Sequence, residues 1–247
     1  MIDLKNKKIL ITGASSGIGR STAILFSSLG AELFITGRNQ SELLLTKNLC
    51  SGKVDSFSCD LCKEEDVLNL LNFLPSIDGM VHSAGKVLPV PVKFIQDKHL
   101  KDVFEVNFNS AVKICSNLLK AGKISDAASI VFISSISVLH SYLGGAPYIS
   151  SKAALEGYAR TLALELSSRK IRVNVIRPAL VRTRIYELTK AAASSEEEVI
   201  KYEKNYPLGI GEPEDVAAAC AFFVSSSSKW ITGSFLNMDG GLTLGGK

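Results

Sequence analysis

Short apolar runs alternate along the chain with longer segments in which apolar residues recur every three or four positions. The short runs predict seven strands, at 9–12, 33–36, 54–59, 79–82, 130–134, 173–176 and 234–237. The longer segments predict helices over 17–29, 39–49, 63–74, 96–120, 148–168 and 213–226. Several of the runs are apolar throughout rather than alternating, which is typical of parallel strands that helices cover on both faces.

The regular alternation of strand and helix predicts an α/β fold with one doubly wound parallel sheet. Because no linker, repeat or low-complexity tract divides the 247 residues, we expect a single domain over 1–247. A charged insertion near 184–211 follows the sixth predicted strand. Ligands bind beyond the carboxyl ends of parallel strands, so this insertion is placed to cover a substrate. A solvated surface helix is the alternative interpretation.

The composition excludes several classes of protein. With 46% hydrophobic and 21% charged residues, the chain is typical of a globular protein and not of a disordered one. The net charge of +4 is small, and no basic stripe with interleaved aromatic residues indicates a nucleic-acid partner. The apolar runs are too short for a membrane helix or a signal peptide, so we expect no membrane partner and a cytoplasmic location. The five cysteines are scattered and predict no metal site.

A glycine-rich turn follows the first predicted strand and opens the first predicted helix. It reads TGASSGIG over 12–19, with the spacing G-x-x-x-G-x-G. In this position backbone N–H groups can approach a pyrophosphate at the positive end of a helix, although a purely structural turn is the alternative. The cofactor-binding residues that we expect in this turn are Gly13, Ser15, Ser16, Gly17, Ile18 and Gly19.

The end of the second predicted strand indicates which dinucleotide is bound. A site for NAD places a carboxylate there for the ribose 2′-hydroxyl, whereas this chain reads TGRN over 36–39. The guanidinium of Arg38 can fork onto a 2′-phosphate, which favours NADP(H) over NAD(H). Arg20 is interpreted as a surface cation rather than a second phosphate ligand. Asp60 is placed to accept a hydrogen bond from the adenine amino group, or else to cap the next helix.

Tyr148 and Lys152 are four residues apart in a predicted helix and therefore share one of its faces. The phenol has an ordinary pKa near 10, and an ammonium group about 4 Å away can lower it by about 3 units. Ser135 directly follows the fifth predicted strand, where its hydroxyl can bind a substrate oxygen. Asn107 lies on the buried face of another predicted helix and can hold a water molecule beside Lys152.

Taken together, these residues resemble those of the short-chain dehydrogenase/reductase family along essentially the whole chain. The turn over 12–19, the four residues just described and the closing ITG and DGG segments within 231–241 match in order and spacing. The resemblance implies a Rossmann-type sheet of about seven strands. It also implies that Tyr148 is the general acid–base and that Ser135 polarises the carbonyl. Lys152 would lower the tyrosine pKa and bind the nicotinamide ribose, and Asn107 would support a proton relay.

The resemblance also extends the set of cofactor-binding positions. The glycine-rich turn, Arg38 and Asp60 are already in this set. The resemblance adds Leu61, Ala84, Gly85, Tyr148, Lys152, Pro178 and Thr183. Two segments depart from the family pattern, because its NNAG reads HSAG over 82–85 and its PG reads PA over 178–179. We expect His82 to be structural. We expect Ala179 to give its loop a different turn, because alanine resists positive φ.

The activity implied is an NADPH-dependent hydride transfer to a ketone carbonyl. A 3-oxoacyl thioester is one candidate substrate, since within the family the chain most resembles the 3-oxoacyl-acyl-carrier-protein reductases. Another alcohol or ketone, such as a sugar, a polyol or a hydrophobic ketone, is the alternative. A non-catalytic NADPH-binding sensor or scaffold is the alternative from another class.

The expected partners are a small carbonyl or alcohol substrate, carried on acyl-carrier protein in the first case, and further copies of the chain. The family usually forms a homotetramer, built on helices such as 96–120 and 148–168, and a dimer is also considered. The residues expected to line the substrate pocket are Ser137, Leu139, His140, Tyr142, 87–92, Ile185 and Tyr186. The basic residues considered for carrier-protein binding are Lys120, Lys123, Arg169 and Arg172, with ordinary solvated charge as the alternative.

Overall fold

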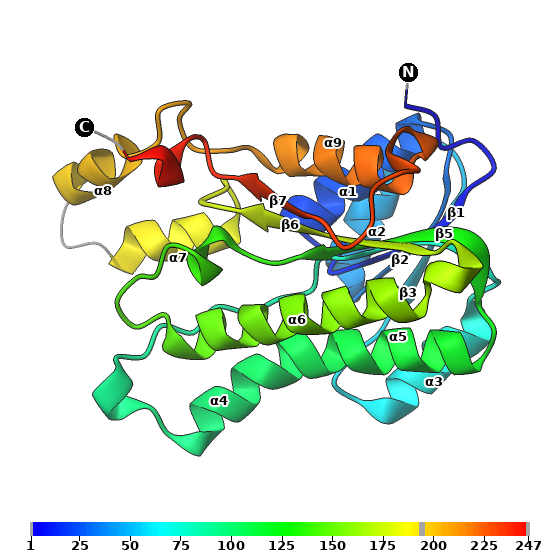
Figure 1. Cartoon of the computed structure of the whole chain (residues 1–247), viewed down its shortest axis with the longest axis horizontal. Helices are drawn as coiled ribbons and strands as arrows, with labels where there is room; N and C mark the ends of the chain where they lie inside the picture. Colours follow the sequence, from blue (N-terminus) through cyan, green and yellow to red (C-terminus); the bar gives the residue numbers. More distant parts are fainter. Residues whose placement is uncertain (1, 193–195, 246–247) are drawn as a thin grey trace.

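A seven-stranded parallel sheet forms the centre of the protein, in a computed structural model that describes residues 2–192 and 196–245 (Figure 1). The strand order is β3-β2-β1-β4-β5-β6-β7, so the order reverses between β1 and β4. The strands are β1 (Lys8–Thr12), β2 (Glu32–Gly37), β3 (Val54–Ser58), β4 (Ile77–His82), β5 (Ile124–Ile133), β6 (Arg172–Pro178) and β7 (Phe235–Met238). This arrangement confirms the doubly wound sheet. It also places the ligand crevice beyond the carboxyl ends of the strands near the reversal.

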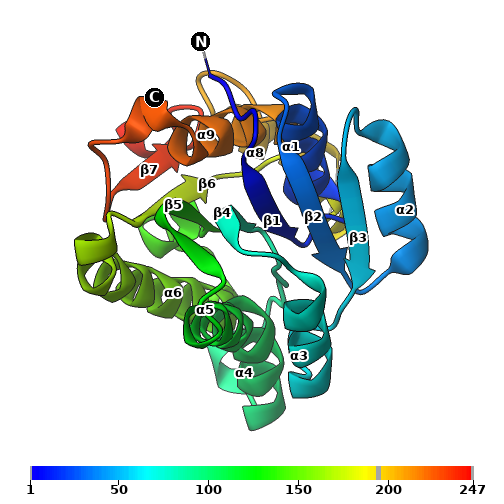
Figure 2. The ribbon, with the colours of Figure 1, turned by 90° about the vertical axis from the view of Figure 1, so that its right-hand side faces the viewer.

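Helices cover both faces of the sheet (Figure 2). The helices α1 (Gly17–Ser28), α2 (Gln40–Leu49) and α9 (Pro213–Val224) lie on one face. The other face carries α3 (Glu64–Phe73), α4 (Asp97–Phe104), α5 (Ser110–Lys120) and α6 (Ala146–Glu165). The two remaining helices, α7 (Arg184–Ala192) and α8 (Glu196–Glu203), lie together at one end of the molecule. Among the described residues, no helix is both long and apolar enough to cross a membrane.

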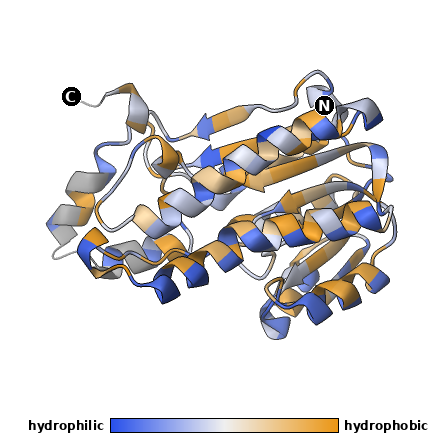
Figure 3. Cartoon of the chain, turned by 60° about the horizontal axis from the view of Figure 1, so that its bottom comes forward, coloured by the Kyte–Doolittle hydropathy of each residue, from blue (hydrophilic) through white to orange (hydrophobic). Residues whose placement is uncertain are grey.

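The apolar strands supply two separate cores. Ile9 and Ile11 of β1 are fully buried against the layer of α1 and α9, whereas Leu10 between them is buried against the opposite layer. Successive side chains of a strand point to opposite faces, so a strand between two helical layers needs apolar residues at every position. Figure 3 shows the consequence, with hydrophobic strands inside and hydrophilic residues on the outward faces of the helices.

Two elements differ from the sequence-based expectations, and the structure adds detail to a third. The predicted helix over 96–120 is interrupted by a π-helical turn, Glu105–Asn109, which separates α4 from α5. Strand β5 begins at Ile124, six residues before the predicted run, and its first part pairs irregularly with β4 and holds Ala127 at a φ of 59°. The insertion near 184–211 is a pair of helices in which the Tyr186 hydroxyl donates to Glu203 and so ties α7 to α8.

Candidate active site

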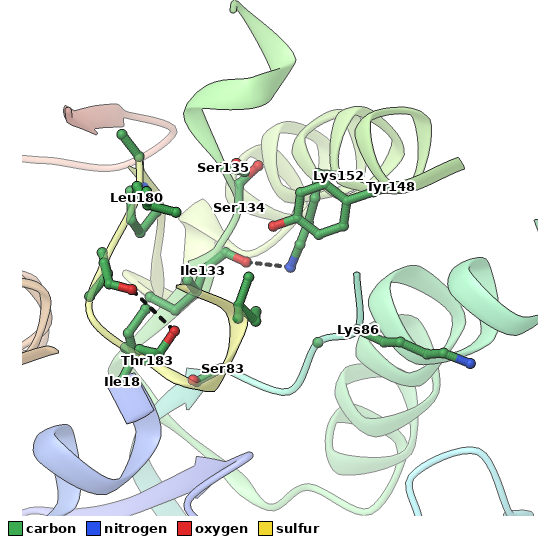
Figure 4. A pocket seen from close by; sticks show the side chains of 15 residues that line it. Ile18, Ser83, Lys86, Ile133, Ser134, Ser135, Tyr148, Lys152, Leu180 and Thr183 are labelled. Atoms are coloured by element: carbon green, nitrogen blue, oxygen red, sulfur yellow. Dashed lines mark hydrogen bonds between the residues drawn. The ribbon is translucent and has the colours of Figure 1, made fainter. Parts of the chain in front are cut away.

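A pocket opens beyond the carboxyl ends of the central strands (Figure 4). It brings together residues from the glycine-rich turn, the loop after β4, the end of β5, helix α6, and the segment from β6 to α7. The lining residues are Ile18, Ser83, Gly85, Lys86, Ile133, Ser134, Ser135, Tyr148, Lys152, Pro178, Ala179, Leu180, Val181, Thr183 and Ile185. Seven of the predicted site residues therefore meet in one pocket, although they are spread over more than 160 positions of the chain. They are Ile18, Gly85, Ser135, Tyr148, Lys152, Pro178 and Thr183.

Tyr148 and Lys152 project from the same side of α6 toward the end of β5 (Figure 4). The Lys152 ammonium lies 5.9 Å from the centre of the Tyr148 ring and donates a hydrogen bond of 2.8 Å to the Ile133 carbonyl. The hydroxyl of Ser135, two residues along, interacts with the Tyr148 hydroxyl. It also donates to the Ser137 hydroxyl at 3.0 Å. Two hydroxyl groups and an ammonium group thus gather at one wall of the pocket.

The electrostatics of this wall differ from the expectation. Burial is the largest influence on the pKa of Tyr148 and raises it, while the hydrogen bond with Ser135 lowers it. Burial also lowers the pKa of Lys152 to about 8, against which the charge of Glu156 raises it. The expected lowering of the tyrosine pKa by Lys152 is therefore corrected. The lysine proton is directed to the Ile133 carbonyl, and desolvation of the phenolate dominates.

Asn107 lies in the π-helical turn and is completely buried. Its amide nitrogen donates to the Lys86 carbonyl and to the Ser151 hydroxyl, both at 2.9 Å, and its oxygen accepts from the Lys86 nitrogen at 2.7 Å. A side-chain carbon added at Gly85 would lie 3.4 Å from the Lys152 nitrogen and 3.5 Å from the Asn107 oxygen. Asn107 and Lys152 therefore border the same small space beside Gly85.

The glycine-rich turn is closed by segments that are distant in the sequence. Gly13 has a φ of +68°, and an added side-chain carbon would lie 2.7 Å from the Ala84 nitrogen, so no larger residue fits there. The corresponding carbon at Gly17, where φ is +52°, would lie 3.1 Å from a Thr183 methyl carbon. Among the described residues, the first turn of α1 holds no acidic side chain. Its N–H groups and the helix dipole are therefore suited to a phosphate.

Arg38 and Arg20 have different surroundings. Arg38 is exposed just beyond β2, and within the described part of the chain it takes part in no ion pair. Arg20 is instead partly buried, and it pairs with Glu42 at 2.6 Å and donates to Thr46 at 3.0 Å and to the Ser15 carbonyl. The Arg20 side chain is 26% exposed, so the interpretation of Arg20 as a surface cation is only partly right, because its guanidinium also holds the glycine-rich turn against α2. Of these two arginines, Arg38 is therefore the one whose guanidinium is exposed at the end of β2.

Asp60 and Leu61 follow β3 at the edge of the sheet. The Asp60 carboxylate accepts a hydrogen bond of 3.1 Å from the Cys62 nitrogen, whereas the residue before the first turn of α3 is Lys63. The alternative that Asp60 caps this helix is therefore wrong, since it caps the preceding turn. Leu61 is buried beside it.

The two departures from the family pattern are structural. His82 ends β4, is 1% exposed, and places its Nδ1 atom 3.0 Å from the Thr12 hydroxyl on β1. Burial, together with the charge of Lys152, lowers the pKa of His82 to about 3, so the imidazole is neutral. Ala179 avoids positive φ, as expected, and its nitrogen donates to the Met238 carbonyl at 2.9 Å.

The substrate side of the pocket is only partly as expected. Ile185 of α7 lines the pocket, but the Tyr186 side chain is buried against Glu203 instead. Leu139 and Leu143 are 56% and 99% exposed, outside the enclosed part of the pocket. The expected lining residues that are absent from the described lining are Ser137, Leu139, His140, Tyr142, 87–92 and Tyr186.

The four basic residues considered for carrier-protein binding lie away from this pocket. Lys120 ends α5 and Lys123 precedes β5, while Arg169 and Arg172 lie just before and at the start of β6. These positions are at the amino ends of the strands, opposite the pocket. Three of the four also donate to backbone carbonyls, so they do not form a basic rim around the pocket of the same chain.

Comparisons with known proteins agree with this geometry. Residues 13–243 match the family model described as enoyl-(acyl carrier protein) reductase. The chain is 32% identical to the 3-oxoacyl-[acyl-carrier-protein] reductase FabG of Rickettsia felis, over 99% of this chain and 100% of that protein. It is 31% identical to a glucose 1-dehydrogenase of Gluconobacter oxydans, over 97% of this chain and 93% of that protein. A solved short-chain type dehydrogenase/reductase from Mycobacterium ulcerans superposes with a TM-score of 0.89 at 28% identity, covering 98% of this chain and 91% of that one.

Proposed function

Because the chain belongs to the short-chain dehydrogenase/reductase family of oxidoreductases, we propose that it is an NADPH-dependent reductase that transfers a hydride to a ketone carbonyl. The observation that carries this proposal is the meeting of Ser135, Tyr148 and Lys152 in one pocket with Ile18 of the glycine-rich turn. A sensor or scaffold has no need of a proton donor beside an ammonium group, which counts against that alternative.

In the proposed reaction, Tyr148 donates its hydroxyl proton to the carbonyl oxygen of the substrate. Its raised pKa keeps the phenol protonated at neutral pH, as a proton donor must be. The Ser135 hydroxyl donates to the same oxygen as negative charge develops on it. The Lys152 ammonium then stabilises the phenolate that remains after proton transfer. When bound, the nicotinamide supplies the hydride.

The residues present fit the proposed cofactor. The acid-free first turn of α1 and the glycines at 13 and 17 suit a pyrophosphate. Gly37 lies close to the turn, since a side-chain carbon there would be 3.2 Å from the Ser15 hydroxyl. The exposed guanidinium of Arg38 next to Gly37 suits the additional 2′-phosphate of NADP(H).

For the substrate we propose a 3-oxoacyl thioester carried on acyl-carrier protein. Support comes from the FabG relatives and from the apolar residues Leu180, Val181 and Ile185 that line the pocket. The glucose 1-dehydrogenase relative favours a sugar as the second candidate.

An NADPH oxidation assay with acetoacetyl thioesters, simple ketones and keto-sugars tests the activity. We expect turnover with at least one class, and a loss of about 100-fold or more in kcat for Tyr148→Phe, since general acid catalysis is typically worth that much. NADPH binding, measured by fluorescence, should be preserved in the variant. Tight NADPH binding by the wild type without turnover of any substrate would support the sensor instead, and full activity of Tyr148→Phe would refute the assigned role.

The cofactor preference is tested by Arg38→Ala. Loss of a charge-assisted contact with the 2′-phosphate should weaken NADPH binding by about 10- to 100-fold and leave NADH binding nearly unchanged. Dissociation constants for both nucleotides, measured with the wild type and the variant, check this. Lys47→Ala is a matched control, because it removes a cation from neighbouring α2 that pairs with Asp55 at 3.9 Å. An equal loss for both nucleotides would contradict the assignment.

A further inference from the structure

A buried carboxylate lies one helical turn beyond Lys152. Tyr148, Lys152 and Glu156 follow at intervals of four residues on α6, so all three side chains lie on one face of the helix. The Glu156 side chain is only 6% exposed. A charge that is so fully buried requires partners, and its partners show which parts of the site it holds.

Glu156 joins three segments of the chain. One of its oxygens accepts from the Ser134 hydroxyl and from Arg177 Nε, both at 2.8 Å, and the other accepts from Arg177 Nη2 at 2.6 Å. Ser134 lies between Ile133, whose carbonyl binds the Lys152 ammonium, and Ser135. The carboxylate therefore links α6 to β6 and to the strand end that positions both Lys152 and Ser135.

The Arg177 partner also contacts β7. Its guanidinium lies 4.6 Å from the centre of the Phe235 ring on β7 and 3.4 Å from the Asn237 oxygen. It is not among the residues that line the pocket, whereas Ser134 and Lys152 are. Of the two charges of this ion pair, the carboxylate of Glu156 is the one that acts on the Lys152 ammonium.

We propose that Glu156 is a positioning residue that keeps Lys152 charged and holds it, together with Ser134–Ser135, in register with Tyr148. This inference rests on the proposed reductase activity, because it explains how that pocket maintains its ammonium group. The positioning acts against burial, which favours the neutral amine of Lys152. The titratable and charged groups around the lysine are Tyr148 and Glu156 on α6, His82 on β4, Lys86 in the following loop and Arg177 on β6.

The sign of the effect follows from these charges. A carboxylate near an ammonium group favours its protonated form, so removing the carboxylate lowers the pKa of Lys152. The arginine charge left behind acts in the same direction. If catalysis requires the charged lysine, activity is present below its pKa and is lost as the pH rises through it. Loss of Glu156 therefore moves the alkaline limit of activity to lower pH.

The test is Glu156→Gln, which keeps a hydrogen-bond acceptor for Ser134 but removes the charge. The Lys152 proton is followed by NMR of isotope-labelled lysine in the free protein, with Lys152→Met assigning the signal. We expect the Lys152 titration midpoint, and the alkaline limb of kcat/KM, to move down by about one pH unit or more. Glu165→Gln removes the same charge from an exposed position on the same helix and should change neither.

If Glu156→Gln lowers the melting temperature but leaves the titration midpoint of Lys152 unchanged, the proposal is overturned. Glu156 would then only hold α6 and β6 together. If the single variant does not fold, the double variant Glu156→Gln with Arg177→Gln leaves no unpaired buried charge, and its midpoint should still fall by a smaller amount. An unchanged titration midpoint of Lys152 in the double variant would also overturn the proposal. Absence of turnover in the wild type would be a failure of the proposed activity, while the NMR titration would still test this inference.

Discussion

Single residues at the candidate site have roles that depend on very local physical chemistry. Ser134 and Ser135 are adjacent and chemically identical, yet the hydroxyl of Ser134 donates to the buried Glu156 while that of Ser135 interacts with Tyr148. The alternation of side chains at the end of β5 separates them. Sequence reasoning selected Ser135 through its position at the end of a predicted strand, and the family resemblance agreed, but it missed Glu156. The only available signal was a carboxylate four residues after Lys152 on the same helix face.

His82 illustrates how burial of one residue makes stability depend on pH. Its pKa is about 3 in the folded protein, where burial opposes its charge, and about 6.5 in an unfolded chain. The unfolded state therefore binds more protons between these values, and the free energy of unfolding falls by about 1.4 kcal/mol per pH unit below about 6.5.

We expect His82→Asn to remove this dependence. Relative to wild type, the variant should gain roughly 2 kcal/mol of stability between about pH 7 and pH 5, as measured by urea unfolding. His140→Asn, a change of an exposed histidine, serves as the control and should leave the pH dependence unaltered. A wild-type unfolding free energy that stays level over this range would argue against a buried neutral imidazole.

At the scale of elements, the strands were predictable and the π-helical turn was not. Each central strand is an apolar run of its own, and such runs are visible in the sequence. The residues around Asn107 continue the helical periodicity of 96–104, so nothing in the pattern marks the interruption over Glu105–Asn109. Asn107 lies in this turn, and its amide group forms hydrogen bonds with Lys86 and Ser151. Those contacts exist only once α6 and the loop after β4 are in place.

At the scale of the whole molecule, exposed apolar residues gather where α6 ends beside the segment before β7. Leu164 is 75% exposed and Trp230 is 96% exposed. A side-chain carbon at Gly233 would lie 3.8 Å from Ala163, which places these two segments side by side. Apolar surface of this kind is typical of contacts between subunits, in keeping with the expected homo-oligomer.

We predict that the protein has the mass of a dimer or tetramer in light scattering. Leu164→Glu should shift it to a smaller species, because burying an unpaired carboxylate in an interface is unfavourable. Leu45→Glu alters a residue that is 51% exposed on α2, at the opposite side of the sheet, and should have no effect. A wild-type protein that is monomeric at every concentration would show that this surface is not an interface.

The sequence by itself determined the doubly wound sheet and the group of residues around Tyr148, because apolar periodicity and short motif spacings are local properties of the chain. Only the tertiary structure decided the environment of each charge. It paired Arg20 with Glu42, directed Lys152 to the Ile133 carbonyl, and buried Glu156 against Arg177. These outcomes depend on desolvation and on partners distant in the sequence, and the spacing of residues along the chain records neither.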